Sequence, residues 1–156
     1  HISHEPNLLG TAGTLLANKL FFKNNTGLLI HADNFTNISL HKLIETHINR
    51  PKDCLLTMLT FVSDNPTSCG IVEINSDGIV IDFHEKVKNP PSNRANGAIF
   101  AFDDDFISWI SSLRPKPKDF SNDVIPLLLG KIATFHTESP YYDIGTFDAL
   151  EKARSL

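Results

Sequence analysis

Residues 27–33 read GLLIHAD, a short apolar run that ends in an aspartate, and the residues after it carry apolar side chains at helical spacing. The run predicts a buried strand, and the spacing predicts a helix from Thr36 or Asn37 to about residue 49. A strand that leads through a turn into a helix is typical of an α/β domain. Asp33 would then lie at the carboxyl end of a strand, where open α/β sheets bind their ligands.

Strands and helices are predicted to alternate through much of the remaining chain. The turn-forming residues Asn75 to Gly78 separate two apolar runs and predict a β-hairpin. This alternation favours an α/β fold with a mixed, mainly parallel sheet flanked by helices. The other predicted elements are a helix over residues 11–22, strands over 54–62, 71–74, 79–83, 98–102 and 132–136, a helix from Asp104 or Asp105, a helix capped by Ser121 and a last helix capped by Thr146.

Length and composition describe an ordinary globular protein. The 156 residues are enough for one domain with a sizeable core, and the net charge is −4 with acids and bases interspersed. The absence of a basic stripe argues against a nucleic-acid partner, and no apolar run is long enough to span a membrane. Two cysteines, Cys54 and Cys69, have no spacing typical of disulfide frameworks or zinc sites. These features predict a cytoplasmic protein.

Charged residues also stand at the ends of two other predicted strands. Asp143 follows Tyr141 and Tyr142, and the run FHEK ends in Glu85 and Lys86. Two carboxylates at one edge of a sheet, Asp33 and Asp143, could hold a hard divalent cation through oxygen ligands. A lysine nearby would add a point charge for phosphate. The combination predicts a site that handles phosphate groups.

Each of these features has a simpler structural explanation. Asp33 could cap the helix that follows it, Asp143 could stabilise a turn, and a Glu-Lys pair is often a solvated strand end. Gly10 and Gly13 could be ordinary loop glycines. What favours function is that all the features occur together in a definite order.

Seven short motifs carry a resemblance to the sugar-1-phosphate nucleotidylyltransferases, and they span nearly the whole chain. The look-alikes include mannose- and heptose-1-phosphate guanylyltransferase-like proteins. Any single motif is weak, whereas the ordered series is specific. The motifs are GTAG at 10–13, HADN at 31–34, CGIVE at 69–73, FHEK at 83–86, NGAIF at 96–100, DFSNDVIP at 119–126 and YDIGT at 142–146.

The resemblance implies a Rossmann-like nucleotidyltransferase fold and transfer of a nucleoside monophosphate from a nucleoside triphosphate to a sugar 1-phosphate. It implies that Asp33 and Asp143 bind Mg²⁺ and that they and Lys86 are the catalytic residues. Cys69 replaces the usual aromatic residue of the motif around it. The implied substrate-binding residues are Gly10, Thr11, Ala12 and Gly13 for the base and ribose, and Asn34, Gly70, Glu85 and Asn96, of which Gly70, Glu85 and Asn96 face the sugar.

One part of the family pattern is missing from the sequence. The amino-terminal glycine-rich loop with its arginine has no counterpart, and the chain begins with His1. Such a loop binds the triphosphate through backbone N–H groups. We therefore expect residues 1–156 to be the carboxyl-terminal part of a single nucleotidyltransferase domain, with little or no activity alone.

Two other functions compete with this interpretation. Asp103 and Asp105 form an Asp-x-Asp pair after a predicted strand, as in glycosyltransferases that use nucleotide sugars. That hypothesis leaves Glu85, Lys86 and Asp143 without a role. The second alternative is a non-catalytic module of the same fold that binds sugar nucleotides, and the missing loop is its main support.

Overall fold

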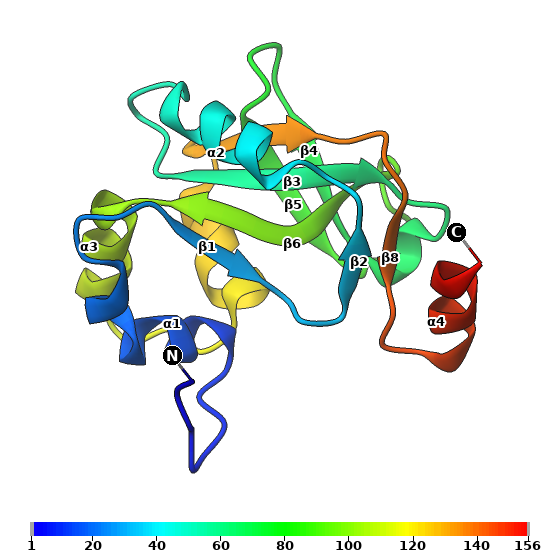
Figure 1. Ribbon diagram of the computed structural model, residues 1–156. Helices are drawn as coiled ribbons and strands as arrows, with labels where there is room; N and C mark the ends of the chain where they lie inside the picture. The colour runs from blue at the N-terminus through cyan, green and yellow to red at the C-terminus, as the bar shows by residue number, and fades with distance from the viewer. Residues whose placement is uncertain (1, 156) are drawn as a thin grey trace.

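A six-stranded mixed sheet forms the centre of the computed structural model, which describes residues 2–155 (Figure 1). The strand order is β5-β4-β6-β3-β7, and β1 pairs with β6 beside this path. The prediction of an α/β fold with a mixed sheet is confirmed. The strands are β1 (Gly27–Ile30), β3 (Leu56–Val62), β4 (Gly70–Ile74), β5 (Val80–Glu85), β6 (Arg94–Phe102) and β7 (Ile132–His136).

The prediction that this sheet is mainly parallel is wrong for the described residues. Strands β3 and β7 pair in parallel, whereas the β1–β6, β3–β6, β4–β5 and β4–β6 pairs are antiparallel. The reason is that β6 lies between β3 and β4 and runs against both. Only the long connection from β6 to β7, which contains helical segments, returns the chain in the direction needed for parallel pairing with β3.

Helices cover both faces of the sheet. One core cluster joins α1 and α3 to one face through Leu15, Phe100 and Phe106, and a smaller one joins α2 to the other face through Leu43 and Ile99. Figure 1 shows α2 on one side of the strands and α1 and α3 on the other. None of the helices within residues 2–155 is both long and apolar enough to cross a bilayer. The helices are α1 (Thr11–Ala17), α2 (Leu40–Ile48), α3 (Asp104–Ser112) and α4 (Phe147–Arg154).

Two helices begin at other residues than their sequence signals predict. Helix α2 begins after Ser39, whose side chain accepts a hydrogen bond from the Lys42 backbone, because Asn34–Thr36 are extended as strand β2. Asp119, and not Ser121, caps the segment that follows it. That segment is one turn of π-helix, Phe120–Val124, continued by a short 3₁₀ turn, Ile125–Leu128.

Strand β6 contains a bulge, which interrupts its regular pairing with the neighbouring strands. The β3–β6 register shifts between Met58 and Thr60, and Ala98 has a positive φ of 48°. The Asn96 side chain holds this kink by accepting a hydrogen bond of 2.9 Å from the Ala98 backbone N–H. On the same edge of β6, β4 pairs before the bulge, and β1 pairs after it. The two strands therefore diverge where the bulge lies.

Candidate functional site

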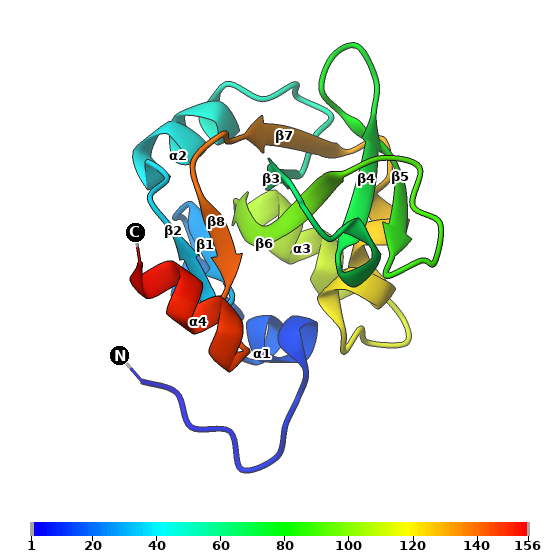
Figure 2. The same ribbon diagram turned by 90° about the vertical axis from the view of Figure 1, so that its right-hand side faces the viewer.

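A small two-stranded sheet brings the two predicted aspartates together. Strand β2 pairs antiparallel with β8 (Tyr141–Asp143), and Asn34 lies opposite Asp143. Figure 2 shows these strands side by side, with α4 next to them. The Ile144 backbone also donates a hydrogen bond of 2.8 Å to the Asp33 carbonyl. The ladder thus joins segments from the two ends of the chain.

The carboxylates of Asp33 and Asp143 face a common point above Gly145. From the position that a Cβ atom on Gly145 would take, Asp143 Oδ1 lies 2.9 Å away and Asp33 Oδ2 lies 3.6 Å away. The Gly145 backbone N–H donates a hydrogen bond of 2.9 Å to Asp143 Oδ1. Glycine therefore leaves open a space that any other residue would fill, and two carboxylates border that space.

A cleft of about 290 Å³ lies at the β6 bulge and collects most of the predicted site residues. Three of its other lining residues, His31, Phe61 and Tyr141, were not predicted as site residues. A larger hollow of about 670 Å³ borders α1, but the described residues around it include no charged side chain. The smaller cleft, by contrast, is lined by several charged side chains. The predicted residues that line it are Asp33, Asn34, Gly70, Glu85, Lys86, Asn96 and Asp143.

Hydrogen bonds to the bulge fix one wall of the cleft. The Gly97 carbonyl accepts from Asn34 Nδ2 at 3.1 Å and also from the Tyr141 hydroxyl. The Tyr141 ring stacks on Phe61, with ring centroids 4.2 Å apart. Burial, together with the charges of Asp143 and Asp33, raises the pKa of Tyr141, so this hydroxyl stays protonated and remains a donor.

Glu85, the last residue of β5, and Lys86, which follows it, also line the cleft. Burial raises the pKa of Glu85, and the nearby Asp119 adds to this effect, whereas Lys86 opposes it. Lys86 has a positive φ of 50°, and its ammonium lies 3.9 Å from the Glu85 carboxylate. The Lys86 side chain is 66% exposed, so its charge is available to an anion in the cleft. A carboxyl with a raised pKa in a cleft is typical of functional sites.

Gly70 makes room for the Glu85 side chain. The two residues are paired across the β4–β5 ladder. A Cβ atom on Gly70 would lie 2.6 Å from Glu85 Oε2 and 2.6 Å from the Phe83 ring. Only glycine allows the Glu85 carboxylate to take this position without a shift of its neighbours.

None of the four residues of Gly10–Gly13 is among the described residues that line the cleft. The segment instead forms hydrogen bonds to the chain next to the cleft. The Ala12 N–H donates a hydrogen bond of 2.9 Å to the Lys118 carbonyl, and Thr11 Oγ1 accepts one of 2.9 Å from the Phe120 N–H. These bonds hold the next residues along, which do line the cleft. They are Asp119, Ser121 and Asn122, and the DFSN motif was the only signal for them in the sequence.

Asp103, the first residue of the competing Asp-x-Asp pair, is already engaged. Its carboxylate accepts hydrogen bonds of 2.9 Å from Arg50 and from Thr26, and His47 Nε2 lies 3.3 Å away. Burial opposes ionisation, but these partners together hold the pKa of Asp103 below its ordinary value. Asp103 also follows the end of β6 that lies away from Asn96 and the cleft. Its role is structural, which removes the main support for the glycosyltransferase hypothesis.

Comparison with known protein families identifies the family of the chain. The sequence model of the family described as "Nucleotidyl transferase" matches residues 1–156. The chain belongs to this nucleotidyl transferase family. The resemblance read from the seven motifs is therefore confirmed at the level of the family.

The curated relatives that match this member of the nucleotidyl transferase family are much longer than the chain. Glucose-1-phosphate adenylyltransferases of Bacillus thuringiensis and Bacillus cytotoxicus are each 25% identical over 154 residues, which is 92% of this chain and 41% of theirs. The chain thus spans about two fifths of the length of these curated relatives.

Two solved structures share the fold. One is a candidate glucose-1-phosphate thymidylyltransferase from Bacillus anthracis in complex with sucrose, with a TM-score of 0.82 and 22% identity over 97% of this chain and 62% of that one. The other is HddC from Yersinia pseudotuberculosis in complex with GMP-PN, with a TM-score of 0.77 and 21% identity over 97% and 64%. The predicted Rossmann-like nucleotidyltransferase fold is confirmed.

Proposed function

We propose that this chain supplies the sugar-phosphate half of an enzyme that transfers a nucleoside monophosphate from a nucleoside triphosphate to a sugar 1-phosphate, releasing pyrophosphate. The observation that carries the proposal is the cleft, which joins the Asp33 and Asp143 carboxylates to Glu85 and Lys86. The proposal covers the reaction type that the names of the matched relatives share.

The carboxylate pair fits a hard divalent cation such as Mg²⁺. Asp33 and Asp143 offer only oxygen atoms, both face the space that Gly145 leaves open, and neither aspartate forms an ion pair within residues 2–155. Oxygen ligands, of which one or two are carboxylates, are what Mg²⁺ takes from proteins, the rest coming from water and phosphate. Bound there, the ion would neutralise charge on the phosphates as the new bond forms.

Lys86 and Glu85 would orient the sugar phosphate. The exposed ammonium of Lys86 can approach a phosphate as a point charge, and the Glu85 carboxylate can accept hydrogen bonds from sugar hydroxyls. A phosphate oxygen of the sugar 1-phosphate would attack the α-phosphorus in line. Because this oxygen is already anionic, the cleft needs no catalytic base, and its residues act by placing the two phosphates and screening their repulsion.

Gly70 and the bulge residues would shape the sugar end of the cleft. Gly70 keeps the Glu85 carboxylate in place, and the Asn34 amide braces the Gly97 carbonyl. The Asn96 side chain is engaged with the Ala98 backbone, so its part in the proposal is to hold the bulge. These contacts support a positioning role for Gly70, Asn34 and Asn96, whereas direct binding of substrate by these residues stays a prediction.

Binding calorimetry with a panel of nucleoside-diphosphate sugars and sugar 1-phosphates, with and without MgCl₂, tests the proposal. We expect at least one nucleotide sugar to bind in a manner that depends on Mg²⁺, and free sugars without phosphate to bind much more weakly. The double variant Asp103→Asn with Asp105→Asn serves as the control and should retain this binding if it retains the fold. Loss of nucleotide-sugar binding in a folded control, or equal binding of free sugars, would contradict the proposal.

A further inference from the structure

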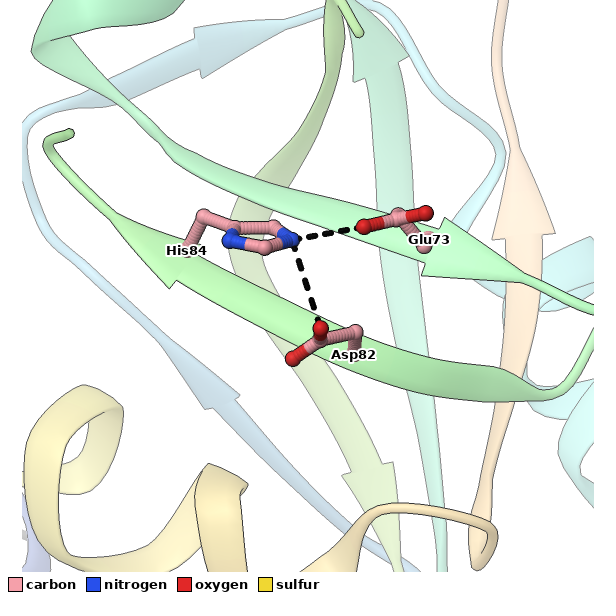
Figure 3. A group of neighbouring side chains, drawn as sticks. All are labelled: Glu73, Asp82 and His84. Atoms are coloured by element: carbon pink, nitrogen blue, oxygen red, sulfur yellow. Dashed lines mark hydrogen bonds and ion pairs between the residues drawn. The ribbon is translucent and has the colours of Figure 1, made fainter. Parts of the chain in front are cut away.

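Three metal-ligating side chains gather on the β4–β5 hairpin (Figure 3). Glu73 lies opposite Asp82 in the ladder, and His84 follows two residues later on β5. The His84 Nε2 atom lies 2.7 Å from Glu73 Oε1 and 3.6 Å from Asp82 Oδ2. One ligand atom from each residue lies within 4.8 Å of the other two. The imidazole nitrogen therefore points between two carboxylates.

This cluster is separate from the cleft. Successive side chains of a strand point to opposite faces, so Asp82 and His84 share one face of β5, and Phe83 and Glu85 share the other. Phe83 packs against the main core cluster, and Glu85 lines the cleft. The function proposed above thus makes no use of Glu73, Asp82 or His84.

We propose that Glu73, Asp82 and His84 form a binding site for a first-row transition metal ion of the Zn²⁺ type. The donor set is one imidazole nitrogen and two carboxylate oxygens. Imidazole suits zinc and its neighbours in the periodic table, whereas Mg²⁺ and Ca²⁺ prefer all-oxygen sites. Two carboxylates would also balance the charge of a divalent ion. Water would complete the coordination, because three protein ligands leave a tetrahedral ion with an open position.

The backbone already sets the three side chains at a suitable spacing. Zinc binds nitrogen and oxygen at about 2.0–2.2 Å, so ligand atoms around a tetrahedral ion lie about 3.4 Å apart. The separations of 2.7 and 3.6 Å from Nε2 bracket this value. Glu73 and Asp82 are 43% and 54% exposed, so their carboxylates can rotate without disturbing the core. The hairpin ladder meanwhile holds the Cα atoms in register.

A surface ion pair is the competing explanation of the cluster. In that case a proton on the His84 Nε2 atom, and not a metal ion, lies between Glu73 and Asp82, and such surface pairs contribute little to stability. A bound metal ion would instead replace that proton at Nε2, because metal-bound imidazole is deprotonated at the ligating nitrogen. The two explanations therefore differ at one atom, which spectroscopy can observe.

The test is a titration of the whole chain with ZnCl₂ alone, without nucleotide or sugar. Calorimetry gives the number and affinity of sites, and imidazole ¹⁵N spectra report the His84 Nε2 atom directly. We expect Zn²⁺ to shift the His84 resonance. Each of the variants His84→Gln, Glu73→Gln and Asp82→Asn should weaken one site by at least tenfold, since loss of even an outer partner of a metal ligand costs roughly 10- to 100-fold.

Two controls distinguish Zn²⁺ binding at this site from Zn²⁺ binding in the cleft and at other exposed histidines. His41 is an exposed imidazole on α2, outside the cluster, so His41→Gln should bind Zn²⁺ as tightly as the parent. The double variant Asp33→Asn with Asp143→Asn should keep the His84 site even if it loses Mg²⁺-dependent nucleotide binding. The proposal is overturned if Zn²⁺ leaves the His84 resonance unmoved, or if the three cluster variants bind Zn²⁺ like the parent.

Thermal unfolding guards against a folding defect in the variants. The three substitutions are close in size to the parent residues, and Glu73 and Asp82 are largely exposed while His84 is partly exposed, so in the presence of a chelator the variants should melt near the parent. Zn²⁺ should raise the melting temperature of the parent and of His41→Gln, but not of the cluster variants, because a ligand that binds only the folded state stabilises it. An equal rise in all proteins would count against the site.

Discussion

Asn34 lies opposite Asp143 in the β2–β8 ladder, and this pairing sets the Asp33 and Asp143 carboxylates on either side of the space above Gly145. The contact joins two segments from opposite ends of the sequence, and it lies outside the six-stranded sheet. The candidate metal ligands therefore depend on a small, separate sheet. Three predictions concern the cleft, and a fourth concerns the buried His47 on α2.

Removing either acidic charge should abolish magnesium-dependent binding of nucleotide sugars. Asp33→Asn and Asp143→Asn keep the size of the side chain and a carbonyl oxygen, so the hydrogen bond from the Gly145 N–H to residue 143 can persist. What they lose is the charge that would hold the cation. Calorimetry with nucleotide sugar and MgCl₂ measures the effect, and the exposed Asp53→Asn serves as the matched control. Binding at parental strength in either variant would show that the metal assignment is wrong.

Lys86→Ala should weaken binding of sugar 1-phosphate more than binding of nucleotide. The ammonium is exposed at the cleft and would contribute one charge-assisted contact to the sugar phosphate, worth about 1.5–3 kcal/mol or roughly 10- to 100-fold in affinity. Separate titrations with the two ligands give the comparison. Lys88→Ala removes a nearby exposed lysine that does not line the cleft and should change neither affinity. Equal losses for both ligands in Lys86→Ala would contradict this role.

Glu85→Gln should stabilise the fold at neutral pH. Burial raises the pKa of Glu85 above its ordinary 4.5, so the native state binds this proton more readily than the unfolded state does. The resulting stability is fully present below pH 4.5 and is lost as the pH rises through the native pKa. At pH 7 the ionised carboxylate of Glu85 therefore lowers the free energy of unfolding, and glutamine, which carries no charge, does not.

Denaturant unfolding of parent and variant across pH 3.5–8 checks this expectation. The gain in Glu85→Gln should be largest at neutral pH and should vanish below pH 4.5. Glu45→Gln, at an exposed carboxylate on α2, serves as the matched control. A destabilised Glu85→Gln at pH 7 would mean that Lys86 compensates the buried charge fully.

His47 should make the fold sensitive to acid. Its ring is buried, with Nδ1 2.9 Å from Thr57 Oγ1 and Nε2 3.3 Å from Asp103. Burial first, and then the charge of Arg50, lowers the pKa of His47 from 6.5 to about 4, so the native state holds a neutral imidazole. As the pH falls, the unfolded state takes up this proton first. The contribution of the neutral His47 ring to the stability of the fold is therefore full above pH 6.5 and is lost as the pH falls towards 4.

The shift corresponds to about 3 kcal/mol, and unfolding free energies measured between pH 4 and pH 7 test it. In His47→Gln, which keeps a side chain able to bond Thr57 but does not titrate, the slope between pH 6.5 and 4 should be smaller than in the parent. An unchanged slope in the variant would assign the acid sensitivity to other groups. A change in the overall stability of the variant does not affect the test, because only the slope of the free energy of unfolding against pH is compared.

Local signals in the sequence predicted many of the elements. Strand β7 has the predicted bounds, Ile132–His136, and the turn at Asn75–Gly78 joins the predicted hairpin. Thr146 caps α4 by accepting a hydrogen bond of 3.3 Å from the Ala149 N–H. These features depend on residues that are neighbours in the chain, so composition and spacing are sufficient to predict them.

Features that depend on distant partners were missed. Apolar spacing along α2 favours Ile48 as a core residue, but its side chain is 68% exposed, and the polar His47 is buried instead. His47 lies one turn after the buried Leu43 and contacts Thr57 and Asp103, both outside the helix. Similarly, residues 34–36 form strand β2 because they pair with β8, which lies more than 100 residues later in the chain. Apolar periodicity within a short stretch contains no information about such a partner.

The amino-acid sequence by itself determined the family, the succession of strands and helices, and the residue types that phosphate chemistry needs, because motifs and periodicity are properties of short stretches of chain. Only the tertiary structure decided which of those residues meet. It gathered Asp33, Asp143, Glu85 and Lys86 into one cleft and left Gly10–Gly13 out of the described lining. It also engaged Asp103 with Arg50 and set His84 beside two carboxylates. The physical reason is that strand pairing and burial act between residues far apart in the chain, and that folding alone brings them within bonding distance.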